Sequence, residues 1–140
     1  ELSYDLMMNR CYWNYMRVYA PEGATLIADD DGDAMEHAGV ESGKQVWARF
    51  IVAAPRQPLR VGLGYYLPQP VLTRVGDAWE YHLLVQKQPG TDTTPLRVAV
   101  TLPAGMRLVS ASPAPARVEG ATVHFESSLA RDQNIRVLMR

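Results

Sequence analysis

Three aspartates at alternate positions are the clearest candidate for chemistry in the sequence. Asp29, Asp31 and Asp33 lie in the run ADDDGDAMEH, and closely spaced carboxylates are typical of calcium-binding loops. An EF-hand loop that began at Asp29 would need Gly at its sixth position and Glu at its twelfth, where this chain has Ala34 and Val40. We therefore interpret the run as a solvated loop between strands. A weak calcium loop of the extracellular type is the alternative.

The other residue types used in catalysis do not form a catalytic pattern. Ser42 directly precedes Gly43 in GVESG, so this stretch is not the G-x-S-x-G nucleophile elbow. His37, His82 and His124 are spread over a loop and two strands without the spacing of metal ligands. The last two histidines have the parity of outer-face residues. The sequence predicts no enzyme activity, metal or cofactor, although a triad assembled from distant strands stays an alternative.

Cys11 is the only cysteine, which excludes an internal disulfide and a cysteine-based zinc cluster. It stands in NRCYWNY at the start of an apolar strand, so we expect a small buried side chain. The alternative is a reactive thiol, or one that forms a disulfide with another chain.

The charge balance argues against several classes of partner. The 140 residues contain 14 Lys and Arg against 15 Asp and Glu, so no broad positive field exists to bind nucleic acid or an anionic membrane. No run of 18 apolar residues occurs. The chain begins with Glu1 rather than Met, and we expect it to be a fragment of a longer protein.

Apolar and polar residues alternate along most of the chain, and no segment longer than about ten residues follows a helical period. Val98, Val100 and Leu102, for example, are separated by single small or polar residues. A period of two is typical of strands with one buried face. The sequence therefore predicts an all-β protein with strands at 2–8, 13–20, 24–28, 45–53, 59–67, 79–87, 96–102, 106–111, 121–126 and 133–139.

These strands fall into two similar sets of five. The first set begins with LSYDLMM and has Pro21 and Gly23 between its second and third strands; the second begins with WEYHLLVQK and has Pro103 and Gly105 at the same place. Proline closes a strand because it lacks an N–H for the ladder, and glycine allows a turn that a Cβ resists. The pattern predicts two tandem copies that pack together, at residues 1–72 and 73–140.

The quoted motifs also carry a family resemblance. The stretch LRVAVTLPAGMRLVSASPAPARVEGATVHFES resembles the Ig-like β-sandwich repeats of many bacterial surface proteins. CYWNYMRVYAPEGATL, GKQVWARFIVAAP and YHLLVQKQPGT resemble the C-terminal extracytoplasmic region of a large bacterial membrane-anchored family whose function is unassigned. The resemblance implies an Ig-like fold, a cell-envelope location and an accessory or interaction role without catalytic residues. One departure is the sequence Arg56-Gln57-Pro58, where the resemblance implies a turn of the Gly-Glu-Ser type.

Aromatic residues are concentrated in the first 81 positions, with Phe125 the single exception. Their parity predicts one sheet face that stacks on sugars or anchors a protein partner, with Val46 and Phe50 on the opposite side as core candidates. Packing of this face against the other copy or against an upstream domain is the alternative. The predicted face consists of Tyr15, Tyr19, Trp47 and Tyr66 together with Arg17 and Arg49.

The sequence thus predicts a non-enzymatic extracytoplasmic interaction or spacer module of a bacterial cell-envelope protein. The expected partners are other domains of the parent protein or another surface protein, without nucleic acid and without direct membrane contact. The alternative is a carbohydrate-binding module that uses the aromatic and arginine face to hold a glycan.

Overall fold

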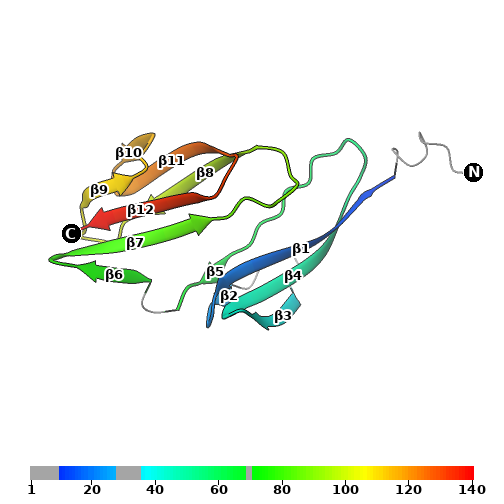
Figure 1. Ribbon diagram of the computed structural model, residues 1–140, viewed down its shortest axis with the longest axis horizontal. Helices are drawn as coiled ribbons and strands as arrows, with labels where there is room; N and C mark the ends of the chain where they lie inside the picture. The colour runs from blue at the N-terminus through cyan, green and yellow to red at the C-terminus, as the bar shows by residue number, and fades with distance from the viewer. Residues whose placement is uncertain (1–9, 28–35, 69–70) are drawn as a thin grey trace, which may run out of the picture. The chain divides into compact units, whose positions relative to one another are not determined.

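The computed structural model describes residues 10–27, 36–68 and 71–140 (Figure 1). These residues form strands and no helix, so the prediction of an all-β protein is confirmed. Within these ranges, no helix has the length and apolar character needed to cross a membrane. The chain divides into two compact units, Glu1–Gln69 and Pro70–Arg140. This division lies slightly before the predicted boundary at residue 72, because Leu72 already pairs with Tyr81 in the second unit.

The first unit contains two antiparallel sheets. Strands β1 (Tyr12–Pro21), β4 (Lys44–Ala53) and β3 (Glu36–Glu41) form one sheet in the order β1-β4-β3, and β2 (Thr25–Leu26) pairs with β5 (Tyr65–Tyr66) in the other. Both sheets contribute to one core, because Ala20 and Trp47 from the larger sheet pack with Leu26 and Tyr65 from the smaller. Met16, Val18, Ala24 and Leu63 complete this core.

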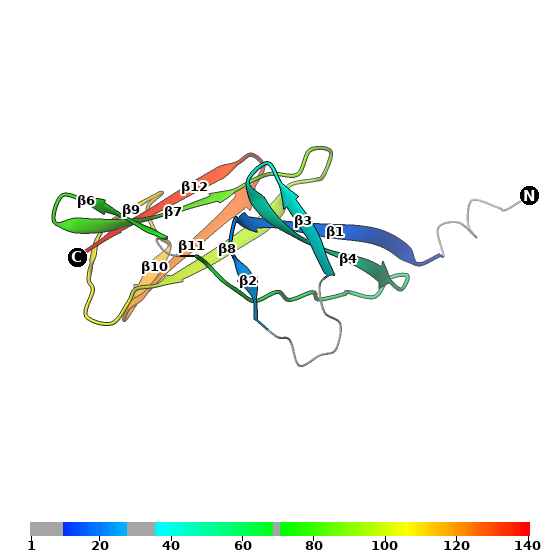
Figure 2. The same ribbon diagram turned by 90° about the horizontal axis from the view of Figure 1, so that it is seen from below.

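The second unit has two larger sheets that enclose one core. One sheet has the order β10-β11-β8 and the other β6-β7-β12-β9, visible as two layers in Figures 1 and 2. Val123 and Phe125 of the first sheet pack against Ile135, Val137 and Met139 of the second. This layered arrangement is consistent with a β-sandwich. The strands are β6 (Leu72–Val75), β7 (Ala78–Val85), β8 (Thr94–Thr101), β9 (Leu108–Ser112), β10 (Arg117–Glu119), β11 (Thr122–Leu129) and β12 (Gln133–Met139).

The two Pro-x-Gly motifs form the same turn. Ala24 N donates to Pro21 O at 3.1 Å, and Met106 N donates to Pro103 O at 3.1 Å. Gly23 and Gly105 both have φ of 83°, a left-handed conformation that favours glycine. In the first unit the turn connects β1 to β2, and in the second it connects β8 to β9, so each turn carries the chain from one sheet to the other.

Several strand predictions need correction. Three short strands were not predicted, β3, β6 and β10, because they are brief and rich in polar residues. Of the predicted strand 59–67, only Tyr65–Tyr66 forms strand pairing within the described residues. The predicted strand 2–8 lies outside those residues. The loop after β4 contains a turn in which Gln57 N donates to Ala54 O at 3.2 Å, and Arg56 has φ of 57°.

Candidate functional site

An exposed group of aromatic side chains lies on the larger sheet of the first unit. The register pairs Tyr15 with Phe50 and Trp13 with Val52, and directly opposite residues of an antiparallel pair share a face. Trp13 is 63 % exposed, Tyr15 55 % and Phe50 54 %. The Trp13 and Phe50 ring centroids are 5.4 Å apart, with their planes tilted by 48°. We call Trp13, Tyr15 and Phe50 the aromatic face.

A charged pair lies farther along the same side of β1. The Arg17 guanidinium donates a hydrogen bond to Glu41 Oε1, and Tyr19 OH donates to Glu41 Oε2 at 3.2 Å. The guanidinium carbon of Arg17 lies 5.3 Å from the centre of the Tyr19 ring, within cation–π distance. Hydrogen bonding from Arg17 lowers the pKa of the Glu41 carboxyl below its ordinary value, and the same contact raises the pKa of Arg17. Glu41 is therefore an ionised hydrogen-bond acceptor at neutral pH rather than a general acid.

Together these features give a surface that is apolar at one end and paired in charge at the other. Val52, also exposed, extends the apolar end beside Trp13. Burial of apolar surface stabilises a complex by about 25 cal/mol per Å², and aromatic residues dominate the energetics of many interfaces. Contiguous exposed apolar groups on a soluble domain are typical of a contact surface. The arrangement has the apolar centre and polar margin of a binding surface.

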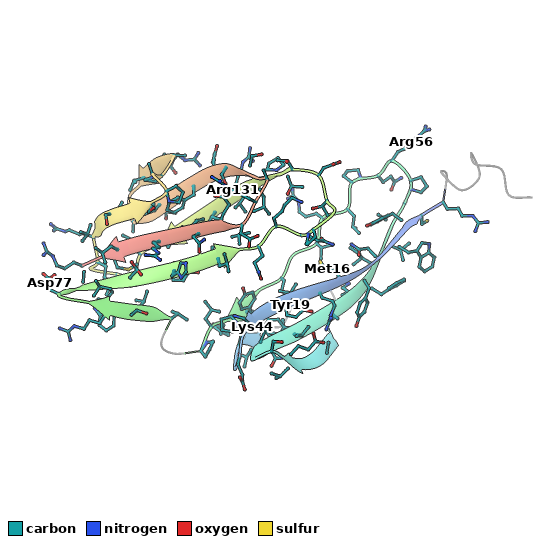
Figure 3. The ribbon with its side chains drawn as sticks, viewed as in Figure 1. Met16, Tyr19, Lys44, Arg56, Asp77 and Arg131 are labelled. Atoms are coloured by element: carbon teal, nitrogen blue, oxygen red, sulfur yellow. The ribbon has the colours of Figure 1, made fainter. Side chains whose placement is uncertain are left out.

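The predicted binding residues separate into three places. Tyr15, Arg17 and Tyr19 stand at alternate, exposed positions of β1 and so share its outer side. Figure 3 labels Tyr19 on this strand. The assignment of Trp47 to that side is wrong, because Trp47 pairs with Val18, is 3 % exposed and packs on Tyr65 with ring centroids 5.3 Å apart.

The remaining two predicted residues also lie away from the aromatic face. Arg49 pairs with Met16, so it lies on the core side of β4 together with Trp47. Tyr66 is 67 % exposed but belongs to β5 in the other sheet.

The register explains a second error and a missed residue. Phe50 was predicted in the core, but its pairing with Tyr15 places it on the exposed side. Val46 is buried, as predicted. Trp13 was not assigned to the face, although it has the same parity as Tyr15 and Tyr19 in β1. That parity is the signal in the sequence that could have identified Trp13.

The prediction that Cys11 is buried is wrong. Its side chain is exposed, and it lies one residue before β1 begins at Tyr12. A position outside the sheet has no neighbouring strand to cover it, so the apolar letters that follow Cys11 in the sequence do not bury it.

The remaining candidates show no catalytic arrangement in the part of the chain that the structure describes. Ser42 and Gly43 form the two-residue turn between β3 and β4, with Ser42 at φ 49°. His82 Nε2 lies 3.0 Å from Asn134 Oδ1, and His124 Nε2 lies 3.4 Å from Glu119 Oε2. His37 lies on β3.

Metal ligands were also considered. Among the described residues, no group of three or more His, Cys, Asp or Glu side chains could hold a metal ion. Asp29, Asp31 and Asp33 lie outside those residues, so the interpretation of their run as a solvated loop stays a prediction.

The second unit contains an apolar groove of about 320 Å³, lined by Leu72, Tyr81, Val100 and Met139 among others. It lies where the edge strands β6 and β8 of the two sheets leave the core open. Its lining contains no charged side chain, so it offers no anchor for an ionic ligand. The aromatic face of the first unit is the stronger candidate site.

Comparisons of the chain with family models, with curated proteins and with solved structures found no match.

Proposed function

We propose that this chain is a non-enzymatic, extracytoplasmic interaction module of a bacterial cell-envelope protein, and that the aromatic face of its first unit contacts a protein partner. The observation that carries the proposal is the exposure of Trp13, Tyr15 and Phe50 side by side on one sheet. Three large aromatic rings left in water are costly unless a partner covers them. The cell-envelope location rests on the resemblance of residues 11–26, 43–55 and 81–91.

A protein partner fits this surface better than a glycan. Sugar rings stack on flat, open aromatic rings that have free hydrogen-bonding groups beside them. Trp47, one of the four rings on which the carbohydrate alternative rested, is buried. Trp13 and Phe50 are tilted by 48° instead of forming one platform, and Arg17 and Glu41 bond to each other. An apolar centre next to a charged pair resembles the core and rim of a protein interface.

The proposal includes an architecture of two tandem Ig-like copies. The order β1-β4-β3 in the first unit corresponds to β8-β11-β10 in the second, and the pair β2-β5 corresponds to β9-β12. The Pro-x-Gly turns occupy the same step of both units. Ala20 and Leu102 precede these turns at equivalent positions, and both are buried. Duplication of one unit accounts for this agreement more simply than chance does.

Replacing both Trp13 and Phe50 with serine tests the function. The immobilised chain is exposed to an envelope extract of cells that make the protein, and the retained proteins are quantified. We expect retention of a specific partner to fall about tenfold or more, because exposed aromatic anchors carry much of the binding energy of an interface. The matched control replaces two exposed valines of the second unit, Val109 and Val118, with serine and should retain the partner.

Equal retention by both variants would refute the aromatic face as the contact. The carbohydrate alternative has its own readout, namely tryptophan fluorescence during titration with soluble envelope polysaccharide. A saturable change that disappears in the Trp13→Ser variant would favour a glycan ligand instead.

A further inference from the structure

The outer edge of β8 has no strand partner in the described part of the chain. Strand β8 lies at the end of the sheet β10-β11-β8 and pairs there with β11 alone. Leu102 N donates to Ala121 O at 2.8 Å, so the backbone polar groups of even-numbered residues in this segment point toward β11. The N–H and C=O groups of Arg97, Ala99 and Thr101 therefore point to the open side. An open edge of this kind is a template for one more strand.

This open edge borders the apolar groove of the second unit. Val100 and Thr101 line the groove from β8, and Leu72 and Met139 line it from the other sheet. Val98 and Val100 are half-buried and pack against the core that contains Met139. A strand that paired with β8 would direct every second side chain to this side of the sheet, where apolar residues fit best.

The sequence of the edge is nearly the same in both directions. Residues 95–103 read PLRVAVTLP, which is symmetric about Ala99 except that Arg97 mirrors Thr101. In an antiparallel pair of two copies with a two-fold axis at Ala99, each residue lies opposite the residue at its mirror position. Apolar residues then meet apolar residues along the whole segment. The edge is therefore complementary to a second copy of itself.

The directions of the backbone groups suit the same register. Ala99 would pair with Ala99 of the second copy, and Arg97 of each copy with Thr101 of the other. These three pairs exchange two hydrogen bonds each, or about six in all, against about ten in a typical protein interface. Pro95 would lie opposite Pro103 of the second copy, and neither has an N–H to donate. The ladder thus ends where the donors end.

Charge favours this register over its neighbours. Arg97 is the one charged residue between Pro95 and Pro103. With the axis at Ala99, each guanidinium lies opposite a neutral threonine, and the two copies of Arg97 are about 13 Å apart along the strands. An axis at Val98 would halve that distance. An axis at Arg97 would place the two guanidiniums directly opposite each other, which is destabilising.

We propose that two copies of this chain associate by antiparallel pairing of their β8 strands about a two-fold axis at Ala99. The pairing continues the sheet β10-β11-β8 from one copy into the other and covers the apolar groove beside each β8. Val98 of each copy lies opposite Val100 of the other on the groove side. The interface is small, so the dimer is reversible and depends on protein concentration. The surface belongs to the second unit, and the proposal does not depend on the aromatic face.

The substitution Ala99→Pro in the full chain tests the pairing. Proline removes the N–H that points to the open edge but spares the ladder with β11, which uses the even-numbered residues. We expect the dissociation constant of the dimer, measured by sedimentation velocity, to rise about tenfold or more, because two of about six hydrogen bonds lose their donors. The matched control is Val118→Pro in β10, at the other edge of the same sheet. Val118 pairs with Val123, whose backbone groups point to β8, so the N–H of Val118 also points away from the sheet.

The control should leave the dissociation constant unchanged. A chain that stays monomeric at millimolar concentration, or a dimer that Val118→Pro weakens as much as Ala99→Pro, would overturn the proposal. A dimer that survives Ala99→Pro but is lost when Trp13 and Phe50 are changed to serine would place the contact on the aromatic face, and would overturn it as well.

Cross-linking through cysteine tests the register without a proline. Ala99→Cys is placed in a Cys11→Ser background, so that it is the one thiol in the chain. At the proposed axis the two Cα atoms are about 5.5 Å apart, within reach of a short bifunctional thiol reagent. Thr94→Cys in the same background is the control, because Thr94 is exposed on the same strand but five positions from the axis, which separates the two copies of it by about 34 Å. We expect cross-linked dimer to form about tenfold faster from position 99, because pairing raises the local concentration of its thiol. Equal rates from the two positions would overturn the proposal.

Discussion

Replacing Phe125 with alanine is expected to lower the free energy of unfolding of the second unit by about 3–5 kcal/mol. Phe125 is 3 % exposed and packs in the core that both sheets of this unit share. A single core of this size supplies only about 3–5 kcal/mol of net stability, so the unit should be largely unfolded. The expected result is loss of the dispersed amide resonances of β11 and β12 in an NMR spectrum.

A matched control separates the loss of the core from a general effect of truncation. Val118 lies on β10 of the same unit with its side chain exposed, and Val118→Ala should change the free energy of unfolding by less than about 0.5 kcal/mol. A Phe125→Ala protein that keeps its dispersed resonances and melts with the Val118→Ala control would contradict the described core.

Truncation of the two tryptophans of the first unit should lower its stability by very different amounts. Trp47→Ala is expected to cost about 3–5 kcal/mol, because Trp47 fills the core between the two sheets and packs on Tyr65. Trp13→Ala should cost less than about 1 kcal/mol of stability, because Trp13 is mostly exposed and loses chiefly its contact with Phe50. Denaturant unfolding of the two variants, followed by near-ultraviolet circular dichroism, measures both values.

The order of these two costs distinguishes the two possible registers of the sheet. A larger loss for Trp13→Ala than for Trp47→Ala would mean that β4 presents its other side to the core. Trp47 would then belong to the exposed face, as its sequence parity suggested.

The strands with long alternating patterns could be predicted from the sequence, whereas their register could not. Alternation in residues 44–53 separates Trp47 from Phe50, but it does not say which of them faces inward. That choice is fixed by the pairing of Val18 with Trp47 and of Tyr15 with Phe50, which joins segments far apart in the chain. Both tryptophan and phenylalanine are suitable core residues, so hydrophobicity gave no further information.

Other errors arose where pairing outweighs local propensity. β10 consists of the exposed residues Arg117–Glu119 and exists because the turn after it returns the chain to β11. Residues 59–64 have the composition and alternation of a strand, yet strand pairing requires a neighbour as well as a suitable sequence. The Pro-x-Gly turns were predicted correctly, because their chemistry depends on residues adjacent in the chain.

Site-specific photo-cross-linking in cells that make the protein tests the central claim most directly. A photoreactive phenylalanine analogue replaces Tyr15 on the aromatic face or, as the control, Tyr66, which is 67 % exposed on the other sheet. We predict one cross-linked protein adduct from position 15, its loss when Trp13 is also changed to serine, and no such adduct from position 66. Absence of an adduct at position 15, or the same adduct from both positions, would contradict a partner bound at the aromatic face.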